Sequence, residues 1–348
     1  MIKILHSADW HLDAPLQGKM QAHQSLLRKA LLAVPGKLAS LCREEGCDLC
    51  LLAGDLFDGA YTKESYRVLY EALEEMAVPV FITPGNHDFA GAASPWLRES
   101  WPGNVHIFTK PQITSVSLPE LSCRVYGSGF DAMDCPSLLE GFRAEGEEKY
   151  AIGIFHGDPI QRNSPYNPIA KSQIASSGLH YLALGHIHKA GKLMEGNTLC
   201  AWPGCPQGHG YDEEGIKGAY IVEVEDTATC RFVSLDGSRF YDLETEPENL
   251  PDLLPPGGSE DFYRVTLVGT CEEIDLDKLQ KEYAAYPNLI FRDRTRRPED
   301  LWGNAGEDSF EGLYFALLKK KAEAGSETAL LAAKLSRKIL NGEEVESK

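Results

Sequence analysis

Residues 47–58 read CDLCLLAGDLFD, an apolar run that ends at a glycine and is followed by two aspartates. A run of this length that stops at a glycine is typical of a buried strand, because a helix needs a longer segment. The run therefore predicts a strand over Asp48–Ala53, with Asp55 and Asp58 just beyond its carboxyl end.

Two further short apolar segments resemble this strand, Ile2–His6 before it and Val78–Thr83 after it. Between the three, Ser25–Glu45 and Lys63–Ala77 repeat apolar residues at the spacing of one helix face, and Pro35 is expected to kink or divide the first helix. This order is a βαβαβ unit. It predicts an α/β fold with parallel, buried strands.

More strand candidates follow, and the last three look antiparallel. They are Val105–Phe108, Ile113–Leu118, Cys123–Tyr126, Tyr150–Phe155, Tyr181–Leu184, Leu199–Trp202, Ala219–Val224 and Cys230–Leu235. We expect a first domain over residues 1–240, a linker rich in acidic residues and proline over residues 241–260, and a smaller α/β domain over residues 261–348 that ends in two helices.

The charge and composition of the chain exclude several classes of protein. With 34 basic and 52 acidic residues, the 348-residue chain has a formal net charge of −18, so a polyanion would have to be bound locally, for instance through divalent cations. No apolar run approaches the roughly 20 residues of a membrane span, and the first residues lack a secretory signal pattern. We therefore expect a cytoplasmic protein with no membrane partner.

The nine cysteines are scattered and odd in number, which argues against a disulfide framework and favours reduced thiols. Cys42, Cys47 and Cys50 are close enough in sequence to raise the question of a metal site. Cys50 lies inside an apolar run, however, and a buried structural cysteine is the favoured interpretation.

Metal-binding side chains follow five of the predicted strands, at the point where each strand ends. They are Asp9 and His11, Asp55, Asn86, His156, and His186 and His188. In open α/β sheets ligands gather beyond the carboxyl ends of the strands, so we expect these side chains to lie together. Mixed oxygen and imidazole ligands suit Mn, Fe or Zn, and seven ligands exceed the needs of one ion. The pattern predicts two divalent cations that share a carboxylate, an arrangement that supports phosphoryl chemistry.

The same residues carry a resemblance to a known family. The series Asp-x-His, Gly-Asp-x-x-Asp, Gly-Asn-His-Asp, His-Gly and Gly-His-x-His is similar to that of the calcineurin-like metallophosphoesterase superfamily. The stretches SADWHL (7–12), AGDLFD (53–58), ALGHIH (183–188) and PGCPQ (203–207) narrow the resemblance to SbcD- and YhaO-like DNA-repair exonucleases. It implies a β-sandwich flanked by helices, in α/β/β/α layers, and a smaller C-terminal α/β capping domain.

The resemblance also implies a role for each residue. The implied ligand sets are Asp9, His11 and His188 for one ion, Asn86, His156 and His186 for the other, and Asp55 as the bridge. Mn is the expected metal, with Fe, Zn and Mg as alternatives. A hydroxide between the metals would hydrolyse a phosphodiester bond, and His87 would stabilise the charge on the phosphoryl group and protonate the leaving oxygen. Asp58 and Asp88 are expected to orient ligating or catalytic imidazoles.

Four basic side chains are candidates for contacts with DNA. Alternation in the predicted strand Leu289–Arg294 places Arg292 and Arg294 on one face, and Arg296 continues the row. In the related family the small domain helps to position DNA, which makes these arginines candidate phosphate contacts; charges that protect an edge strand would give the same pattern. His209 stands where relatives often carry arginine, and we expect it to approach a phosphate with a pH-dependent charge.

The last predicted helix, Ser326–Leu340, has an apolar stripe of Leu331, Leu335 and Ile339 that needs a cover. The resemblance implies docking on a coiled-coil ATPase of the SbcC type, and packing within its own domain is the alternative.

Three functions are compatible with these observations. The first is a Mn-dependent nuclease that acts on double-stranded DNA ends or single strands together with an ATPase. The second is a metallophosphoesterase for cyclic nucleotides or other small phosphoesters. The third is a non-catalytic scaffold, which is disfavoured because every expected ligand is present. Homodimers are common in the family, and the apolar face around Leu27 and Leu31 would be the surface for one here.

Overall fold

The structure is a computed structural model that describes residues 1–16, 21–298 and 300–342. The chain divides into two compact units, of which the first contains Met1–Leu243, Pro255–Val265 and Tyr283–Ile290. The second contains Glu244–Leu254, Thr266–Glu282 and the described residues from Phe291 onward. All seven predicted metal ligands belong to the first unit.

The first unit contains two six-stranded sheets, of which the first has the order β12-β11-β1-β2-β3-β4. Strands β1 to β4 are parallel, and β11 pairs antiparallel with both β1 and β12. The strands are β1 (Ile2–Ser7), β2 (Leu49–Leu52), β3 (Val80–Ile82), β4 (Val105–Ile107), β11 (Gly218–Val224) and β12 (Ala228–Ser234).

The second sheet has the order β5-β6-β7-β8-β10-β9. Its strands are β5 (Thr114–Leu118), β6 (Cys123–Gly127), β7 (Tyr150–His156), β8 (Tyr181–Gly185), β9 (Gly191–Glu195) and β10 (Thr198–Trp202). The four central strands are parallel, and β5 and β9 pair antiparallel at the edges. The antiparallel character expected for β10 therefore holds for its pairing with β9 and is wrong for its pairing with β8.

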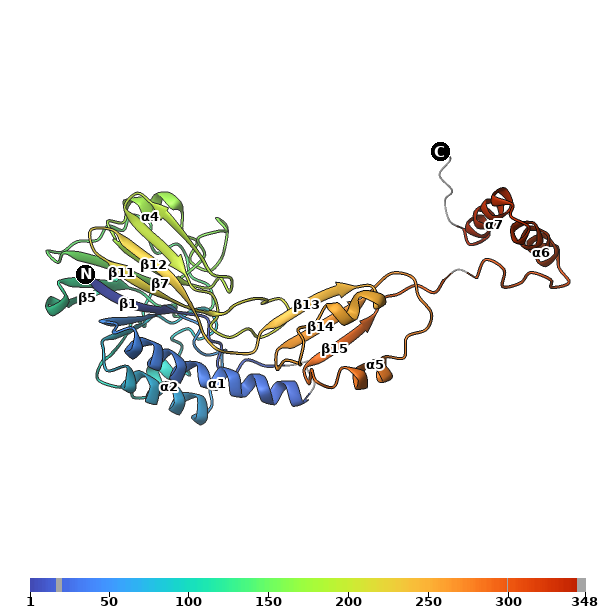
Figure 1. The fold of residues 1–348 in the computed structure, drawn as a ribbon. Helices are drawn as coiled ribbons and strands as arrows, with labels where there is room; N and C mark the ends of the chain where they lie inside the picture. The colour runs from blue at the N-terminus through green and yellow to red at the C-terminus, as the bar shows by residue number, and fades with distance from the viewer. Residues whose placement is uncertain (17–20, 299, 343–348) are drawn as a thin grey trace. The chain divides into compact units, whose positions relative to one another are not determined.

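Helices cover the outer face of each sheet (Figure 1). The helices of this unit are α1 (Gln21–Glu44), α2 (Lys63–Met76), α3 (Pro95–Arg98) and α4 (Lys171–Ser176). Leu38 of α1 and Leu73 of α2 belong to one core cluster with Leu52 of the first sheet, and Ile174 of α4 packs in another with Leu182 of the second sheet. Helix α1 continues through Pro35, where a kink or division was expected. None of the described helices is long and apolar enough to cross a membrane.

A third apolar cluster lies between the two sheets. Ile4 and Leu51 from the first sheet meet Ile152 and Ala183 from the second, and all four are fully buried. Because side chains alternate along a strand, Leu52 points to the helices while Leu51 points to the other sheet. This explains the continuous apolar runs and confirms the expected α/β/β/α layers.

The structure differs from the expected linker over residues 241–260. Its first part belongs to β13 (Phe240–Thr245), which forms a third sheet with β14 (Phe262–Leu267) and β15 (Leu289–Asp293), and a 3-10 helix covers Pro247–Asp252. The exposed acidic residues Asp242 and Glu244 alternate with half-buried neighbours in β13, so their abundance marks a polar strand face. The boundaries that we predict for the two domains, at residues 240 and 261, stay a prediction.

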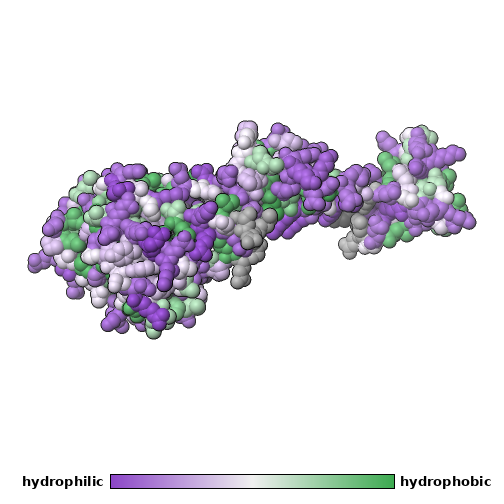
Figure 2. Space-filling view, turned by 90° about the horizontal axis from the view of Figure 1, so that it is seen from below, coloured by the Kyte–Doolittle hydropathy of each residue, from purple (hydrophilic) through white to green (hydrophobic). Residues whose placement is uncertain are grey.

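The remaining helices are α5 (Leu276–Glu282), α6 (Phe310–Glu323) and α7 (Glu327–Leu340). The described residues do not cover the apolar stripe of α7: Leu331 and Ile339 are 56% and 64% exposed, and Ala329 and Ala333 are the buried residues of this helix. Hydrophobic residues are accordingly visible among hydrophilic ones on the surface of the C-terminal helices (Figure 2). The structure therefore does not support the alternative in which the stripe packs within its own domain.

The face of α1 that suggested a homodimer is occupied within the chain. Leu27 packs in a cluster with Phe240 and Phe262, and Leu31 belongs to the core under the first sheet. Both side chains are buried. A homodimer would need a different surface.

His6 links the two sheets through hydrogen bonds. Its Nε2 lies 3.0 Å from the Leu184 carbonyl oxygen of β8, which can only accept, so Nε2–H is the donor. Its Nδ1 then accepts from the Tyr181 hydroxyl at 2.6 Å. The neutral ring satisfies both partners. Burial lowers the pKa of His6 to about 3, since a charged ring would be desolvated there.

We predict that His6 makes the fold sensitive to acid. The unfolded chain protonates His6 near pH 6.5 and the folded chain only near pH 3, so the free energy of unfolding falls as the pH drops below 6.5. At pH 5 this loss amounts to about 2 kcal/mol. His6→Gln keeps a donor and an acceptor without the titration, and urea unfolding of the metal-free proteins at pH 7.5 and pH 5 should show a smaller pH dependence for the variant. Equal pH dependence of both proteins would contradict the assignment.

Candidate metal centre

The seven predicted ligands come from both sheets and meet at the carboxyl ends of five strands. Asp9 and His11 follow β1, Asp55 follows β2 and Asn86 follows β3, all in the first sheet. In the second sheet, His156 ends β7, and His186 and His188 follow β8. Each group of ligands therefore combines residues from the two layers of the sandwich.

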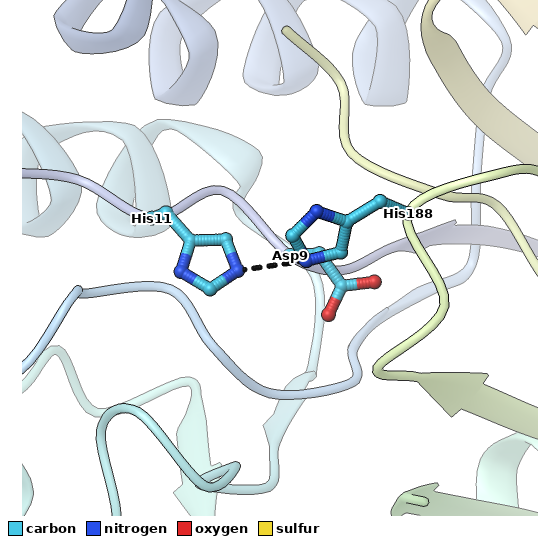
Figure 3. A group of neighbouring side chains, drawn as sticks. All are labelled: Asp9, His11 and His188. Atoms are coloured by element: carbon cyan, nitrogen blue, oxygen red, sulfur yellow. Dashed lines mark hydrogen bonds between the residues drawn. The ribbon is translucent and has the colours of Figure 1, made fainter. Parts of the chain in front are cut away.

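Asp9, His11 and His188 form the first group (Figure 3). The Nε2 atoms of His11 and His188 lie 3.1 Å apart. Asp9 Oδ1 accepts from the backbone N–H of His186 at 2.8 Å, whereas Asp9 Oδ2 is buried and finds no hydrogen-bond partner among the described residues. A buried carboxylate oxygen without a donor is costly, and a cation beside it would remove that cost.

Asn86, His156 and His186 form the second group. Asn86 Oδ1 lies 3.0 Å from His156 Nε2 and 3.2 Å from His186 Nδ1. Asp55 Oδ2 lies between the groups, 3.2 Å from His156 Nε2 and 3.9 Å from His11 Nε2. Asp55 is therefore the carboxylate that could contact a cation in each group. The donor set and the unpaired Asp9 oxygen fit two divalent cations with mixed oxygen and nitrogen ligands.

Fixed acceptors orient the imidazole rings. His11 Nδ1–H donates to Asp58 Oδ1 at 3.2 Å, and His156 Nδ1–H donates to the Ala53 carbonyl at 2.9 Å. In the neutral form of both rings the proton then lies on Nδ1 and Nε2 is directed at the centre with a lone pair for a cation, as in metal sites where the other ring nitrogen is hydrogen-bonded. His186 is turned the other way, with Nδ1 toward Asn86 and Nε2 3.9 Å from Asp158 Oδ2.

The backbone adopts unusual conformations at the ligands. Asp9, His11, Asp55 and His186 have φ values of 55°, 45°, 52° and 95°. Each such left-handed residue costs on the order of 1–2 kcal/mol, and such strain clusters at functional sites. The loops are held by hydrogen bonds from Asp9 N–H to the Gly54 carbonyl and from His11 N–H to the Asp55 carbonyl, both 3.0 Å.

Two glycines make room for the ligand side chains. A Cβ atom at Gly54 would lie 2.4 Å from His156 Nδ1, and one at Gly85 would lie 2.2 Å from Asp55 Oδ1. Neither position tolerates a side chain. Glycine is therefore needed directly before Asp55 and directly before Asn86, because a larger residue would collide with the side chains of the centre.

The structure corrects the role expected for Asp88. Its buried carboxylate accepts from the backbone N–H groups of Gly85, Asp55, Leu56 and Phe57, at 2.7 to 3.3 Å, and no hydrogen bond to an imidazole is found among the described residues. It ties the loop after β3 to the loop after β2. Burial and the charge of Asp55 raise the pKa of Asp88 to about 6.

Asp58 lies between two histidines, His11 and His87. Its Oδ1 accepts from His11 Nδ1–H and, at 2.5 Å, from His87 Nδ1–H. These hydrogen bonds hold the pKa of Asp58 well below its usual range and raise the pKa of His87. The His87 side chain is 48% exposed, and its ring lies 4.7 Å from that of His11, measured between centroids.

The charges of the centre require positive partners. Burial alone would raise the pKa of Asp55, but His156 and His11 hold it below its usual range. Burial works against a charge on His156, yet Asp55 outweighs it and raises the pKa of His156 to about 9. In the absence of cations, the carboxylates therefore favour a proton on His156. Bound cations would supply the same positive charge. Burial lowers the pKa of His186, which favours the neutral form that ligates metals.

His209 lies at the centre but has no free ring nitrogen. Its Nδ1 lies 2.9 Å from Glu213 Oε2, and its Nε2 lies 3.2 Å from the Trp10 carbonyl oxygen. A phosphate contact of the kind expected from the sequence would have to displace one of these partners.

Glu213 and Asp158 also lie at the centre, although the sequence pattern did not predict them. Glu213 stands among exposed acidic neighbours in the sequence, and nothing in the residue pattern distinguishes it from them. Asp158 follows His156-Gly157 directly, a spacing that could have drawn attention to it.

The predicted DNA contacts Arg292, Arg294 and Arg296 are all exposed. Strand β15 ends at Asp293, so the predicted alternation places only Arg292 within the strand, while the N–H groups of Arg294 and Arg296 bond to the carbonyls of Leu267 and Gly269.

This chain matches one family model and resembles several known proteins. The family model described as calcineurin-like phosphoesterase matches residues 2–190. The uncharacterized metallophosphoesterase YhaO of Bacillus subtilis (strain 168) is 29% identical over 306 residues, which cover 78% of this chain and 73% of that protein. The SbcD component of nuclease SbcCD from the same organism is 22% identical over 341 residues, covering 83% and 84%. A dimetal phosphatase from Danio rerio aligns with 67% of this chain and 96% of its own, at 11% identity and a TM-score of 0.47.

The matched region contains every ligand of the candidate metal centre, from Asp9 to His188. It also covers more than half of the sequence. The chain therefore belongs to the calcineurin-like phosphoesterase family.

Proposed function

We propose that this protein is a two-metal-dependent phosphodiesterase that cleaves DNA, as an exonuclease or endonuclease in cytoplasmic DNA repair. The observation that carries the proposal is the exposed His87, held by Asp58 at the rim of a centre that fits two cations. The likeness to the SbcD component of nuclease SbcCD over 83% of the chain supports DNA as the substrate. Mn is the metal we propose.

His87 is arranged to act on a phosphoryl group. Because its Nδ1–H donates to Asp58, its Nε2 faces outward and has no hydrogen-bond partner within the described part of the chain. When bound, the two cations would acidify a water molecule and neutralise phosphate charge. His87 would then stabilise the charge that develops on the phosphoryl oxygens and donate a proton to the leaving sugar oxygen.

A cavity of about 680 Å3 adjoins His87. Its walls include the rings of Tyr61 and Phe89, and much of its lining consists of the small residues Gly59, Ala60, Gly91, Ala92 and Ala93. This space can hold the part of a substrate on one side of the scissile phosphate.

The net charge supports a second candidate. A chain with a formal charge of −18 repels a long polyanion, and this favours cyclic nucleotides or other small phosphoesters as substrates of the same centre.

An SbcC-like coiled-coil ATPase is the proposed partner of the nuclease. The exposed stripe of Leu331, Leu335 and Ile339 on α7 supports this, together with Phe310 and Leu313 on α6, which are 88% and 63% exposed. A groove of about 250 Å3 lined by residues of both helices accompanies these side chains. Phe310 and Ile339 both line this groove, and exposed apolar side chains gathered in this way are typical of an interface.

The proposal predicts Mn2+-dependent cleavage of DNA. We would incubate the purified protein with Mn2+ and, in parallel, end-labelled duplex DNA, single-stranded DNA, a cyclic nucleotide and p-nitrophenyl phosphate esters. The expected result is release of labelled nucleotides from DNA with the highest kcat/KM, abolished by EDTA and by Asp55→Asn. Turnover of the small esters alone would favour the second candidate, and no turnover of any substrate would favour a scaffold.

His87→Ala is predicted to lower kcat by about 10²–10⁴-fold, since the variant lacks the general acid. It should retain two Mn2+ per chain, because His87 is not among the ligands. His106→Ala, which removes an exposed ring on β4, is the matched control and should keep parental kcat. Parental turnover of His87→Ala would reject the role, and metal content measured by elemental analysis separates it from loss of the centre.

Arg292→Glu with Arg294→Glu is predicted to weaken binding of a fluorescent duplex and to reduce its salt dependence. Each lost phosphate contact should lower the slope of log Kobs against log salt by about 0.9. Lys319→Glu with Lys320→Glu makes the same change in net charge on α6 and should leave that slope unchanged. An unaltered slope in the arginine variant would favour the protection of an edge strand.

A further inference from the structure

Glu213 is a buried carboxylate beside the first group of ligands. It lies in the segment between β10 and β11, and its side chain is only 10% exposed, whereas Asp212 and Glu214 on either side are exposed. The chain therefore turns one of three consecutive acidic residues inward.

Four donors meet the two oxygens of Glu213. Oε1 accepts from His188 Nδ1–H. Oε2 accepts from the backbone N–H of His209 at 2.7 Å, from His209 Nδ1–H at 2.9 Å and from Cys205 Sγ–H at 3.5 Å. A carboxylate with this many donors is fixed in position, and it fixes the groups that donate to it.

The first consequence concerns His188. Because a carboxylate only accepts, the proton of a neutral His188 lies on Nδ1, and the lone pair of Nε2 is directed toward His11 Nε2, 3.1 Å away. His188 is also the ligating ring that packing restrains least, with 36% of its side chain exposed against 5% for His11 and 0% for His156. The orientation of His188 therefore depends more on its hydrogen bond to Glu213 than the orientations of His11 and His156 depend on their own hydrogen bonds.

The second consequence concerns the loop that carries Asp9 and His11. His209, held by Glu213, reaches the carbonyl of Trp10 through Nε2 at 3.2 Å. Trp10 lies between the two ligands. A single carboxylate thus connects directly to His188 and, through His209, to the backbone carbonyl between Asp9 and His11.

We propose that Glu213 is a positioning residue that fixes His188 and the Asp9–His11 loop, and thereby sets the affinity of one cation site without setting that of the other. The inference rests on the metal centre and not on the nuclease activity. Its test needs no substrate, so failure of the proposed function would leave its outcome unchanged.

The test is titration of the metal-free protein with Mn2+ by calorimetry. The parental chain should bind two ions. Glu213→Ala should bind one ion with parental affinity and the other about 10–100-fold more weakly, the usual effect of removing such a partner. Glu213→Gln, which retains one acceptor oxygen and nearly the same shape, should fall between the two. If Glu213→Ala does not fold, Glu213→Gln provides the test in its place.

Glu214→Ala is the matched control. It removes the same charge from the next residue, whose carboxylate accepts from the exposed Asp242 N–H, and should bind both ions as the parent does.

A tautomer measurement separates positioning from a general structural effect. Long-range ¹⁵N–¹H spectra of the histidines in the Zn2+-loaded parent should show His188 protonated at Nδ1 and bound through Nε2. In Glu213→Gln the His188 signals should change while those of His156 stay parental.

Three results would overturn the proposal. One is parental affinity for both ions in Glu213→Ala and Glu213→Gln. Another is equal weakening of both ions. The last is a third ion in the parent that is lost with Glu213, which would make the group His188, Cys205 and Glu213 a cation site of its own.

Discussion

Electron-rich groups crowded at one edge of a sandwich need positive charge among them, and the rest of the structure depends on this requirement. Two imidazole nitrogens lie 3.1 Å apart, and beside them a buried oxygen of Asp9 has no donor within the part of the chain that the structure describes. The pKa of His156 is raised to about 9 because Asp55 outweighs the effect of burial. Without bound cations, burying this cluster of charged and polar groups would only lower the stability of the fold. Its persistence next to a well-packed core is the physical signature of a cation site.

The fold supplies the framework that holds this cluster in place. Parallel strands deliver the ligands to one edge, and left-handed turns at Asp9, His11, Asp55 and His186 aim them at a common point. Backbone N–H groups compensate by binding inward-facing carboxylates, most clearly at Asp88, which accepts from four of them. Strain at the ligands is thus balanced by hydrogen bonds immediately behind them.

Much of this could be predicted from the sequence, and the failures have physical causes. The ligands could be found because each follows an apolar strand, and the side of a sheet on which strands end is set by their direction. The role of Asp88 could not, because backbone donors are invisible in a residue pattern. Glu213 could not, because its burial depends on a loop conformation and not on its neighbours. The burial of Leu27 could not be predicted, because Phe240 and Phe262, which cover it, lie more than 200 residues away in sequence. Acidic residues in β13 resembled a linker because a half-exposed strand is polar on alternate positions.

The division of the ligands between two sheets has a mechanical meaning. Each cation would be gripped by residues from both layers, Asp9 and His11 against His188 at one position, and Asn86 against His156 and His186 at the other. Bound ions would then act as non-covalent crosslinks between the layers and add their binding free energy to that of folding. Chelation should loosen the sandwich first at its ligand-bearing edge, while the opposite end, held by apolar packing between the sheets, stays closed.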